Sequence, residues 1–288
     1  MPDAGNGAPI YRPDAASGYH PGIDHRSQHH EIMRLGIISA LHEEQQGLVD
    51  AMRGAATLIH GKRAYCLGQL WEIDAVCVLS RIGKVAAAMT ATTLVEKFGV
   101  THILFTGVAG AGDSTVRVGD IVVAEALVQH DMDASPLFPR FEVPLTGISH
   151  FQPDAQLSMR VSRAAHDFLE QDLLDAVSAG ERRAFGLVQP RVHRGLVASG
   201  DRFMTDRAHL AGLNAALPGL VAVEMEGAAV AQVCYELGVP CAVIRTISDN
   251  ANEDAAVDFM RFVTSVAAQY AFQITRRVCR DLRNAPLS

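Results

Sequence analysis

The feature that most constrains this chain is an apolar run that ends in two carboxylates, within residues 222–229, which read AVEMEGAA. Glu224 and Glu226 stand two residues apart, and the small residues after them have a helical pattern. A second apolar run, residues 241–249, ends in the same way with Asp249. A carboxylate at the end of a buried strand is costly unless a ligand or a partner needs it. Two strands that each deliver an acid at their carboxyl end predict a ligand site in an α/β sheet.

Composition and charge exclude several classes of protein. The 288-residue chain is 49% hydrophobic and has a formal net charge of −7, and it contains no run of Lys and Arg that would bind nucleic acid. No apolar run approaches the roughly 18–20 residues that span a bilayer, and no signal peptide is visible. The five cysteines form no CxxC pair, which is typical of a reduced cytosolic protein. We therefore expect a cytoplasmic protein that contacts neither nucleic acid nor membrane.

Strand and helix patterns alternate along most of the chain. Residues 1–32 are polar, rich in Gly, Pro and His, and are predicted to be a disordered N-terminal extension. Residues 33–288 are predicted to form one α/β domain with helices on both faces of a mixed sheet. The expected elements are short strands within 56–81, strands at 34–40, 101–106, 120–125 and 195–198, the two acid-ended strands, and helices at about 43–52, 84–98, 154–174, 207–216, 225–237 and 255–281.

Four acidic side chains at the ends of apolar segments suit the cleavage of a glycosidic bond: Glu44, Glu224, Glu226 and Asp249. In such a reaction one acid protonates the leaving group, and another deprotonates a water on the opposite face of the sugar. Each acid alone fits a structural role equally well, because acids are favoured in first helical turns and Asp commonly caps a loop or helix. Their joint placement favours a site.

Residues 107–112, which read GVAGAG, invite comparison with a dinucleotide-binding loop, but a turn and a strand follow where that fingerprint requires a helix. NAD binding is therefore not expected. The backbone of Val108, Ala109 and Gly110 would instead approach a flat or sugar-like ligand closely, and an ordinary tight turn explains the glycines equally well. The sequence has no HExxH or paired zinc spacing, and the run from Asp249 fails the calcium-loop pattern, so no metal and no cofactor is expected.

Seven short motifs occur in an order that identifies a family. They are RLGIISALHEE at 34–44, SRIGKV at 80–85, TGVAG at 106–110, VGDIV at 118–122, SGDRF at 199–203, VEME at 223–226 and RTISD at 245–249. Taken together, from about residue 33 to 281, they resemble the 5′-methylthioadenosine/S-adenosylhomocysteine nucleosidases of the nucleoside phosphorylase superfamily. The resemblance implies a three-layer αβα fold with a central mixed, partly barrel-like sheet, assembled as a homodimer. It also implies hydrolysis of the N-glycosidic bond of an adenine thionucleoside, releasing adenine and a thioribose.

The resemblance further implies roles by motif position. Asp249 matches the general acid that protonates adenine N7, Glu44 matches the carboxylate that activates the attacking water, and Glu226 matches the acid that binds the ribose hydroxyls. The other implied residues are Met225 against the sugar, Phe203 stacked on adenine, the backbone of Met204 at the adenine edge, Phe259 near the ribose and 5′ group, and Arg245, Ser248 and Glu224 as supports. On residue type alone, Phe203 and Phe259 fit the core equally well.

Elementary chemistry agrees with these roles. Adenine leaves poorly until N7 is protonated, so Asp249 must hold a proton near neutral pH, and burial raises a carboxylic pKa. The sugar becomes cationic in the transition state, so an anionic Glu226 in a desolvated pocket would stabilise it selectively.

Three features depart from the family pattern. Val108 stands where some relatives have serine, Arg81 stands where glycine is common, and residues 131–145 do not align with relatives. Since that segment helps to shape the 5′ pocket, the 5′ substituent stays open among methylthioadenosine, adenosylhomocysteine, 5′-deoxyadenosine and deoxyfutalosine nucleosides.

Two other functions compete with hydrolysis. A phosphate-dependent purine nucleoside phosphorylase would need cationic or backbone donors beside the ribose, but the Gly-Asp-Pro-x-Arg loop of such enzymes is missing and Glu43 and Glu44 stand there. A non-catalytic nucleoside-binding protein on the same fold would have no need to keep Glu44, Glu226 and Asp249 together. Both alternatives are therefore less favoured than hydrolysis.

Overall fold

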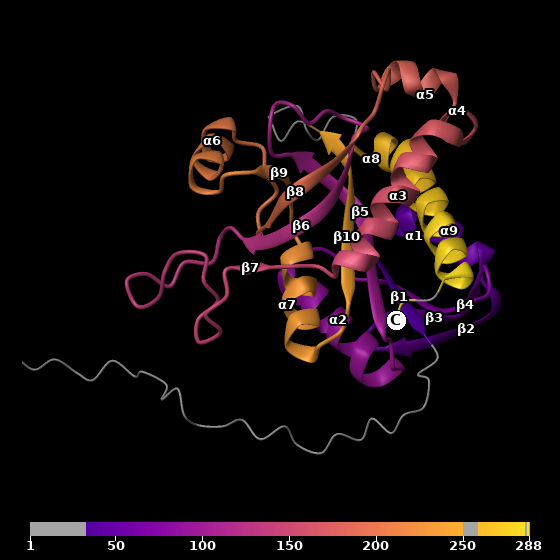
Figure 1. The fold of residues 1–288 in the computed structure, drawn as a ribbon, viewed down its shortest axis with the longest axis horizontal. Helices are drawn as coiled ribbons and strands as arrows, with labels where there is room; N and C mark the ends of the chain where they lie inside the picture. Colours follow the sequence, from indigo (N-terminus) through magenta and orange to yellow (C-terminus); the bar gives the residue numbers. More distant parts are fainter. Residues whose placement is uncertain (1–32, 250–258, 286, 288) are drawn as a thin grey trace, which may run out of the picture. The chain divides into compact units, whose positions relative to one another are not determined.

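A single mixed sheet organises the described part of the chain, residues 33–249, 259–285 and 287, in this computed structural model (Figure 1). Its ten strands are β1 (Arg34–Ser39), β2 (Arg53–His60), β3 (Arg63–Leu70), β4 (Ile73–Leu79), β5 (His102–Ala111), β6 (Ile121–Gln129), β7 (His150–Phe151), β8 (Val192–Ser199), β9 (Leu220–Glu224) and β10 (Cys241–Asp249). The predicted disordered extension, residues 1–32, lies outside the described residues.

The middle of the sheet closes on itself. The strand order is β10-β6-β8-β9-β5-β1-β4-β3-β2, and β10 also pairs with β5. Strands β5, β6, β8, β9 and β10 therefore form a ring, and the remaining strands extend from it. This closure confirms the expected partly barrel-like sheet, and it removes free edges from the strands that carry the predicted site.

Helices cover both faces of the sheet, as the α/β pattern predicts. The helical elements of the described residues are α1 (His42–Ala51), α2 (Lys84–Phe98), α3 (Ala155–Gln171), α4 (Leu173–Ala176), α5 (Ala179–Ala184), α6 (Arg207–Ala216), α7 (Gly227–Leu237), α8 (Phe259–Phe262), the π-helical η1 (Val263–Ala267) and α9 (Ala268–Asn284). Within these ranges, every helix is too short or too polar to traverse a bilayer.

Two large apolar cores lie between the helices and the sheet, and a smaller one packs α6 against it. One core joins α1, α3 and α9 to the sheet, and α9 contributes Tyr270, Ile274 and Val278, which recur every four residues on one buried face. The other core joins α2 and α7 to the opposite face, through small side chains such as Ala87 and Ala228 that allow close approach. This arrangement of helices, sheet and helices is the expected three-layer architecture (Figure 1).

Local signals predict several elements well. Helix α2 spans the predicted residues 84–98 and ends at Gly99, whose φ of 61° lies in the left-handed region that glycine adopts easily. Helix α6 also matches its prediction, and Asp206 caps it by accepting from the backbone N–H of Ala208 and His209.

The predicted glycine-rich loop at 107–112 is wrong, because β5 continues through Ala111. Its residues pair with β10 on one side and β9 on the other. Gly112, directly after the strand, serves a close approach: a Cβ there would stand 2.8 Å from the backbone nitrogen of Ala222 in β9. The predicted last helix is also divided, because α8, η1 and α9 succeed one another from Phe259 onward.

Candidate active site

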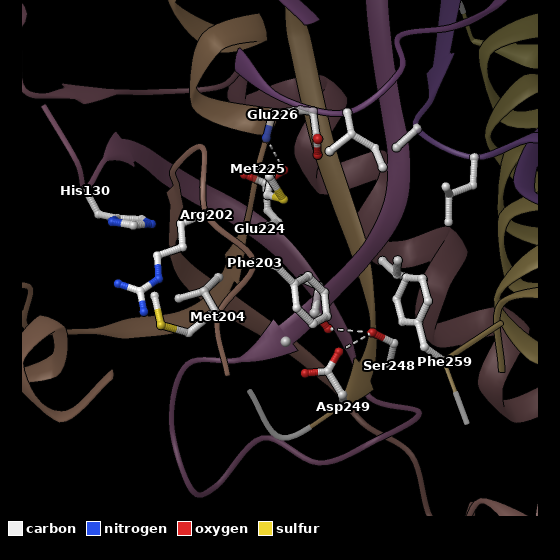
Figure 2. A pocket seen from close by; sticks show the side chains of 17 residues that line it. His130, Arg202, Phe203, Met204, Glu224, Met225, Glu226, Ser248, Asp249 and Phe259 are labelled. Carbon is white, nitrogen blue, oxygen red and sulfur yellow. Dashed lines mark hydrogen bonds between the residues drawn. The ribbon is translucent and has the colours of Figure 1, made fainter. Parts of the chain in front are cut away.

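A cavity of about 150 Å³ opens where β5, β9 and β10 meet (Figure 2). Eleven of the predicted site residues line it: Val108, Ala109, Gly110, Phe203, Met204, Glu224, Met225, Glu226, Ser248, Asp249 and Phe259. The lining is mainly apolar with a few convergent polar groups, which is typical of a small-molecule site. The two remaining predicted residues, Glu44 and Arg245, lie outside the lining and are buried beside it.

Glu44 is held by the backbone that enters α1. Its Oε2 accepts from the N–H groups of Ala40 and Leu41, at 3.1 and 3.0 Å, and both of those residues line the cavity. Its Oε1 has no hydrogen-bond partner within the described residues. A Cβ on Gly107 would stand 3.5 Å from that oxygen and 3.6 Å from Nη1 of Arg245, so Gly107 of β5 lies directly beside both groups. Glu44 is therefore fixed through one oxygen, with the other available.

Burial sets the protonation of Glu44. Desolvation raises its pKa from 4.5 to about 7, against the lowering effects of its backbone hydrogen bonds and of Arg245. A general base is most effective when its pKa is near the working pH. The position and the pKa of Glu44 together suit proton abstraction from a water.

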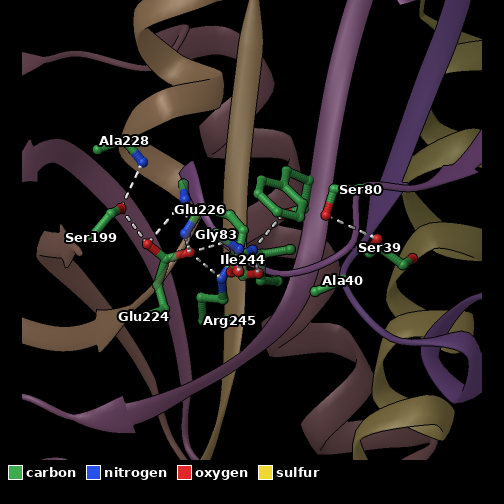
Figure 3. A network of polar contacts seen from close by, with 12 residues as sticks. Ser39, Ala40, Ser80, Gly83, Ser199, Glu224, Glu226, Ala228, Ile244 and Arg245 are labelled. Atoms are coloured by element: carbon green, nitrogen blue, oxygen red, sulfur yellow. Dashed lines mark hydrogen bonds and ion pairs between the residues drawn. The ribbon is translucent and has the colours of Figure 1, made fainter. Parts of the chain in front are cut away.

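Glu224 and Arg245 form a buried ion pair beneath the cavity (Figure 3). Nη2 of Arg245 lies 2.7 Å from Oε2 of Glu224, and their side chains are 1% and 2% exposed. Glu224 also accepts from the Ser199 hydroxyl and from the N–H groups of Glu226 and Gly227, at the start of α7. Both carboxylate oxygens of Glu224 therefore have hydrogen-bond partners. These contacts connect β8, β9 and β10 to the N-terminus of α7. They hold the backbone from which Glu226 projects.

Glu226 is buried at the start of α7 and accepts from the N–H of Gly83, 2.7 Å from its Oε1. Burial, and next the charge of Glu224, raise the pKa of Glu226 to about 7. The environment therefore disfavours the anionic form of Glu226 that the chemistry calls for. A cationic sugar beside it would favour the anion.

Asp249 ends β10 and is buried at the cavity. The hydroxyl of Ser248 contacts it, with Oγ 2.7 Å from Oδ2, and also reaches the carbonyl of Ala109 at 3.3 Å. The pairing of β10 with β5 shifts register between Ile247 and Asp249, and such a bulge re-aims the side chains next to it. Asp249 therefore stands opposite Gly110 in the lining.

Two aromatic rings flank the cavity near Ser248 and Asp249 (Figure 2). Phe203, in the loop after β8, and Phe259, at the start of α8, meet edge to face with their centroids 6.1 Å apart and an interplanar angle of 81°. Phe203 is 44% exposed, whereas Met204 beside it is buried. A half-exposed ring beside a buried apolar wall suits stacking on a flat base.

Six residues that sequence reasoning did not select also line the cavity: Ala40, Leu41, Ile82, His130, Arg202 and Val223. His130 follows β6, an apolar run that ends in polar residues, which is the same signal that selected Asp249. The other five lie inside the recognised motifs, so their positions in those motifs could have identified them.

Arg81, which departs from the family pattern, adopts a backbone conformation that explains why glycine suits this position. Its φ is 66°, in the left-handed region that costs other residues about 1–2 kcal/mol. The Arg81 guanidinium compensates by donating to the carbonyl of Lys62 at 2.5 Å. Among the described residues, no three His, Cys, Asp or Glu side chains are placed to hold a metal ion.

The closed sheet between helical layers, with buried carboxylates around an apolar cavity, defines an enzyme of the nucleoside-cleaving class. The profile of the phosphorylase superfamily matches residues 34–280. The chain belongs to the 5′-methylthioadenosine/S-adenosylhomocysteine nucleosidase family within that superfamily, and it is an N-glycosyl hydrolase that acts on a nucleoside.

Curated relatives and solved structures are the basis of this assignment. The nucleosidase of that name from Shewanella denitrificans is 33% identical over 242 residues, which cover 84% of this chain and 97% of the relative. The S-adenosylhomocysteine nucleosidase of Streptococcus pyogenes, solved with 5-methylthiotubericidin, has a TM-score of 0.76 and 31% identity, covering 89% of this chain and 99% of that one. The futalosine hydrolase of Helicobacter pylori has a TM-score of 0.75 and 30% identity, covering 88% and 100%.

Proposed function

We propose that this enzyme hydrolyses 5′-methylthioadenosine, S-adenosylhomocysteine or both, releasing adenine and a 5-thioribose. The observation that carries the proposal is the gathering of three acids from separate parts of the chain: Glu226 and Asp249 line one apolar cavity, and Glu44 is buried beside it. The names of the curated relatives support the substrate class. The futalosine hydrolase among the structural relatives leaves 5′-deoxyadenosine and futalosine-type nucleosides as the substrates to compare.

In this proposal Asp249, Glu226 and Glu44 each have a separate role in the reaction. Asp249 gives its proton to adenine N7 and turns adenine into a good leaving group. As the glycosidic bond breaks, charge develops on the sugar, and Glu226 stabilises that charge through the ribose hydroxyls. Glu44 takes a proton from the water that attacks the anomeric carbon.

The lining residues then position the substrate. Phe203 and Phe259 hold the base and the 5′ side, the backbone of Met204 binds the adenine edge, and Met225 packs on the sugar. The strand segment of Val108, Ala109 and Gly110 passes close to the nucleoside. Ser248, Arg245 and Glu224 act through the groups that they hold, as their hydrogen bonds support.

Water, and not phosphate, is the proposed attacker. The guanidinium of Arg245 is engaged by Glu224, and a phosphate anion placed next to Glu44 would be repelled. We expect adenine release from methylthioadenosine to proceed at the same rate in phosphate-free buffer and in phosphate buffer, measured as free adenine by chromatography. A strict requirement for phosphate would instead establish a phosphorylase, and binding without adenine release would establish a non-catalytic protein.

We propose further that the enzyme is a homodimer that uses the face around the start of α2 and the segment 131–149. Large apolar side chains are exposed there: Ile82, Val85, Met89, Leu137 and Leu145. Lys84 contacts Asp131, so the two segments are neighbours. Gathered apolar exposure of this kind is typical of a protein interface.

Val85→Asp is expected to convert the dimer to a monomer, because Val85 is 82% exposed and an aspartate buried in an interface would be unpaired. Light scattering after gel filtration measures the mass. The matched control is Val188→Asp, since Val188 is 93% exposed on another segment and should leave the mass unchanged. A Val85→Asp protein that keeps its dimer mass would refute this interface.

The domain bounds and the cellular location of the enzyme are proposed on separate grounds. We propose that residues 33–288 form the catalytic domain, which the profile match to 34–280 supports, and that residues 1–32 form an extension outside it. We also propose a cytoplasmic location, supported by five buried cysteines that are all free.

A further inference from the structure

We propose that Lys84 and Asp131 form a clamp that positions the loop of residues 200–204, which follows β8 and carries Phe203 and Met204. In the proposed function, on which this inference rests, that loop binds adenine. Neither Lys84 nor Asp131 lines the cavity. They are positioning residues that act through Asp201.

Hydrogen bonds join Lys84, Asp131 and Asp201 into a closed ring. Nζ of Lys84 lies 2.5 Å from Oδ1 of Asp131 and 4.0 Å from Oδ2 of Asp201. The other oxygen of Asp131 accepts from the backbone N–H of Asp201 at 2.9 Å. The backbone N–H of Lys84 donates to Oδ1 of Asp201 at 2.8 Å. Both the backbone and the side chain of Asp201 are thus fixed.

The start of α2 links this ring to the sugar side of the cavity. Gly83 has a φ of 97°, and α2 has no side-chain cap and no acid in its own first turn. Instead, its first backbone N–H groups donate to carboxylates from other segments: Gly83 donates to Glu226, and Lys84 donates to Asp201. A helix N-terminus favours carboxylates, so one helix end holds both the proposed ribose acid and the purine loop.

The loop leaves β8 through a close contact that fixes its first residue. A Cβ on Gly200 would stand 2.3 Å from Nε2 of His130, which is buried and lines the cavity. A larger residue at position 200 would therefore displace the His130 ring. The packing of Gly200 and the contacts of Asp201 with the clamp together restrict the loop from which Phe203 projects.

The strength of these contacts suits a positioning role better than a role in stability. Within one subunit, the side chains of Lys84, Asp131 and Asp201 are 15%, 34% and 51% exposed, and Lys84 and Asp131 adjoin the proposed dimer face. Ion pairs with this exposure contribute at most about 1 kcal/mol to folding. Phe203, by contrast, is half-exposed and meets Phe259 only edge to face. Removing the clamp should therefore free the purine loop without unfolding the protein.

The test is a comparison of kcat and KM for methylthioadenosine, with the Kd for adenine from calorimetry. Lys84→Met should raise KM and the adenine Kd about fivefold, a loss of about 1 kcal/mol in binding, while kcat changes by less than about twofold. Lys84→Arg, which keeps a cation at the same place, should restore both constants. Lys97→Met is the matched control, because Lys97 lies in the last turn of the same helix and contacts His60.

Asp131→Asn gives an independent second variant, since it keeps the side-chain shape and weakens only the charged contacts. The double variant with Lys84→Met should be no worse than either single one, as expected for two members of one contact. If wild-type enzyme releases adenine but both single variants keep wild-type KM and adenine Kd, the clamp is refuted and the proposed function stands. If wild-type enzyme releases no adenine, the proposed function fails, and unchanged adenine affinity in the variants would then refute the clamp as well.

Discussion

Asp249→Asn is expected to lower kcat for adenine release by about 10²–10⁴-fold, the range that general acid catalysis contributes. Asn has nearly the same shape and can still accept a hydrogen bond from Ser248, which lies 2.7 Å from Asp249. It has no proton to give to adenine N7. The loss should appear in kcat, because protonation of the base matters in the transition state more than in the bound substrate.

A change of leaving group separates the loss of acid catalysis from general damage to the site. A nitrophenyl riboside releases a stable phenolate and needs no proton, so Asp249→Asn should cleave it nearly as fast as wild-type enzyme does. Asp50→Asn is the control, because Asp50 is exposed on α1 and contacts only Gln46 among the described side chains. Equal losses on adenosine-type and nitrophenyl substrates would contradict the acid assignment.

Glu44→Gln is expected to remove hydrolysis and to make the protein more stable at alkaline pH. Gln cannot take a proton from water, so kcat should fall by about 10²–10⁴-fold. In wild-type enzyme, the pKa of about 7 for Glu44 predicts that kcat/KM falls as pH drops below about 7, where the base becomes protonated.

The sign of the stability effect follows from the raised pKa of Glu44. The native state holds its proton up to about pH 7, whereas the unfolded chain releases it near 4.5. Stability from this group is therefore complete below about pH 4.5 and is lost as pH rises through 7. A shift of this size corresponds to at most about 3 kcal/mol. Glu44→Gln avoids this loss, so its free energy of unfolding should exceed that of wild type at pH 8.

Urea unfolding at pH 5 and pH 8 measures the difference, which should shrink towards the lower pH. Glu43→Gln is the neighbouring control on α1 and should change activity and stability little. A stability gain of equal size at both pH values would show that the charge of Glu44 is not its source. Retained hydrolysis by Glu44→Gln would rule out Glu44 as the base.

Sequence alone predicted those features that depend on neighbouring residues. The repeat of apolar residues, followed by Gly99, predicts α2. An acid directly after an apolar run marks the end of a strand, as at Glu224 and Asp249, and Glu226 stands at the start of α7. These signals are local, so no knowledge of the tertiary structure is needed to read them.

The features that the sequence did not predict depend on contacts between distant segments. The glycines of 107–112 look like a loop, and only the neighbouring β9 and β10 reveal them as strand. Burial by the whole fold, and not residue type, brings the pKa of Glu226 to about 7. The clamp between Lys84 and Asp131 joins residues 47 apart, and no motif spans that distance.

The closed ring of five strands separates the part of this enzyme that must stay fixed from the parts that can vary between relatives. Strand β5 pairs with both β9 and β10, so the strand ends that carry Glu224 and Asp249 are held in one closed frame. In the proposed function, the walls beside the base and the 5′ group come instead from the segments after β6 and β8 and from α8, which are outside the ring. Substitutions in those segments can therefore exchange one nucleoside for another while bond cleavage continues on an unaltered frame.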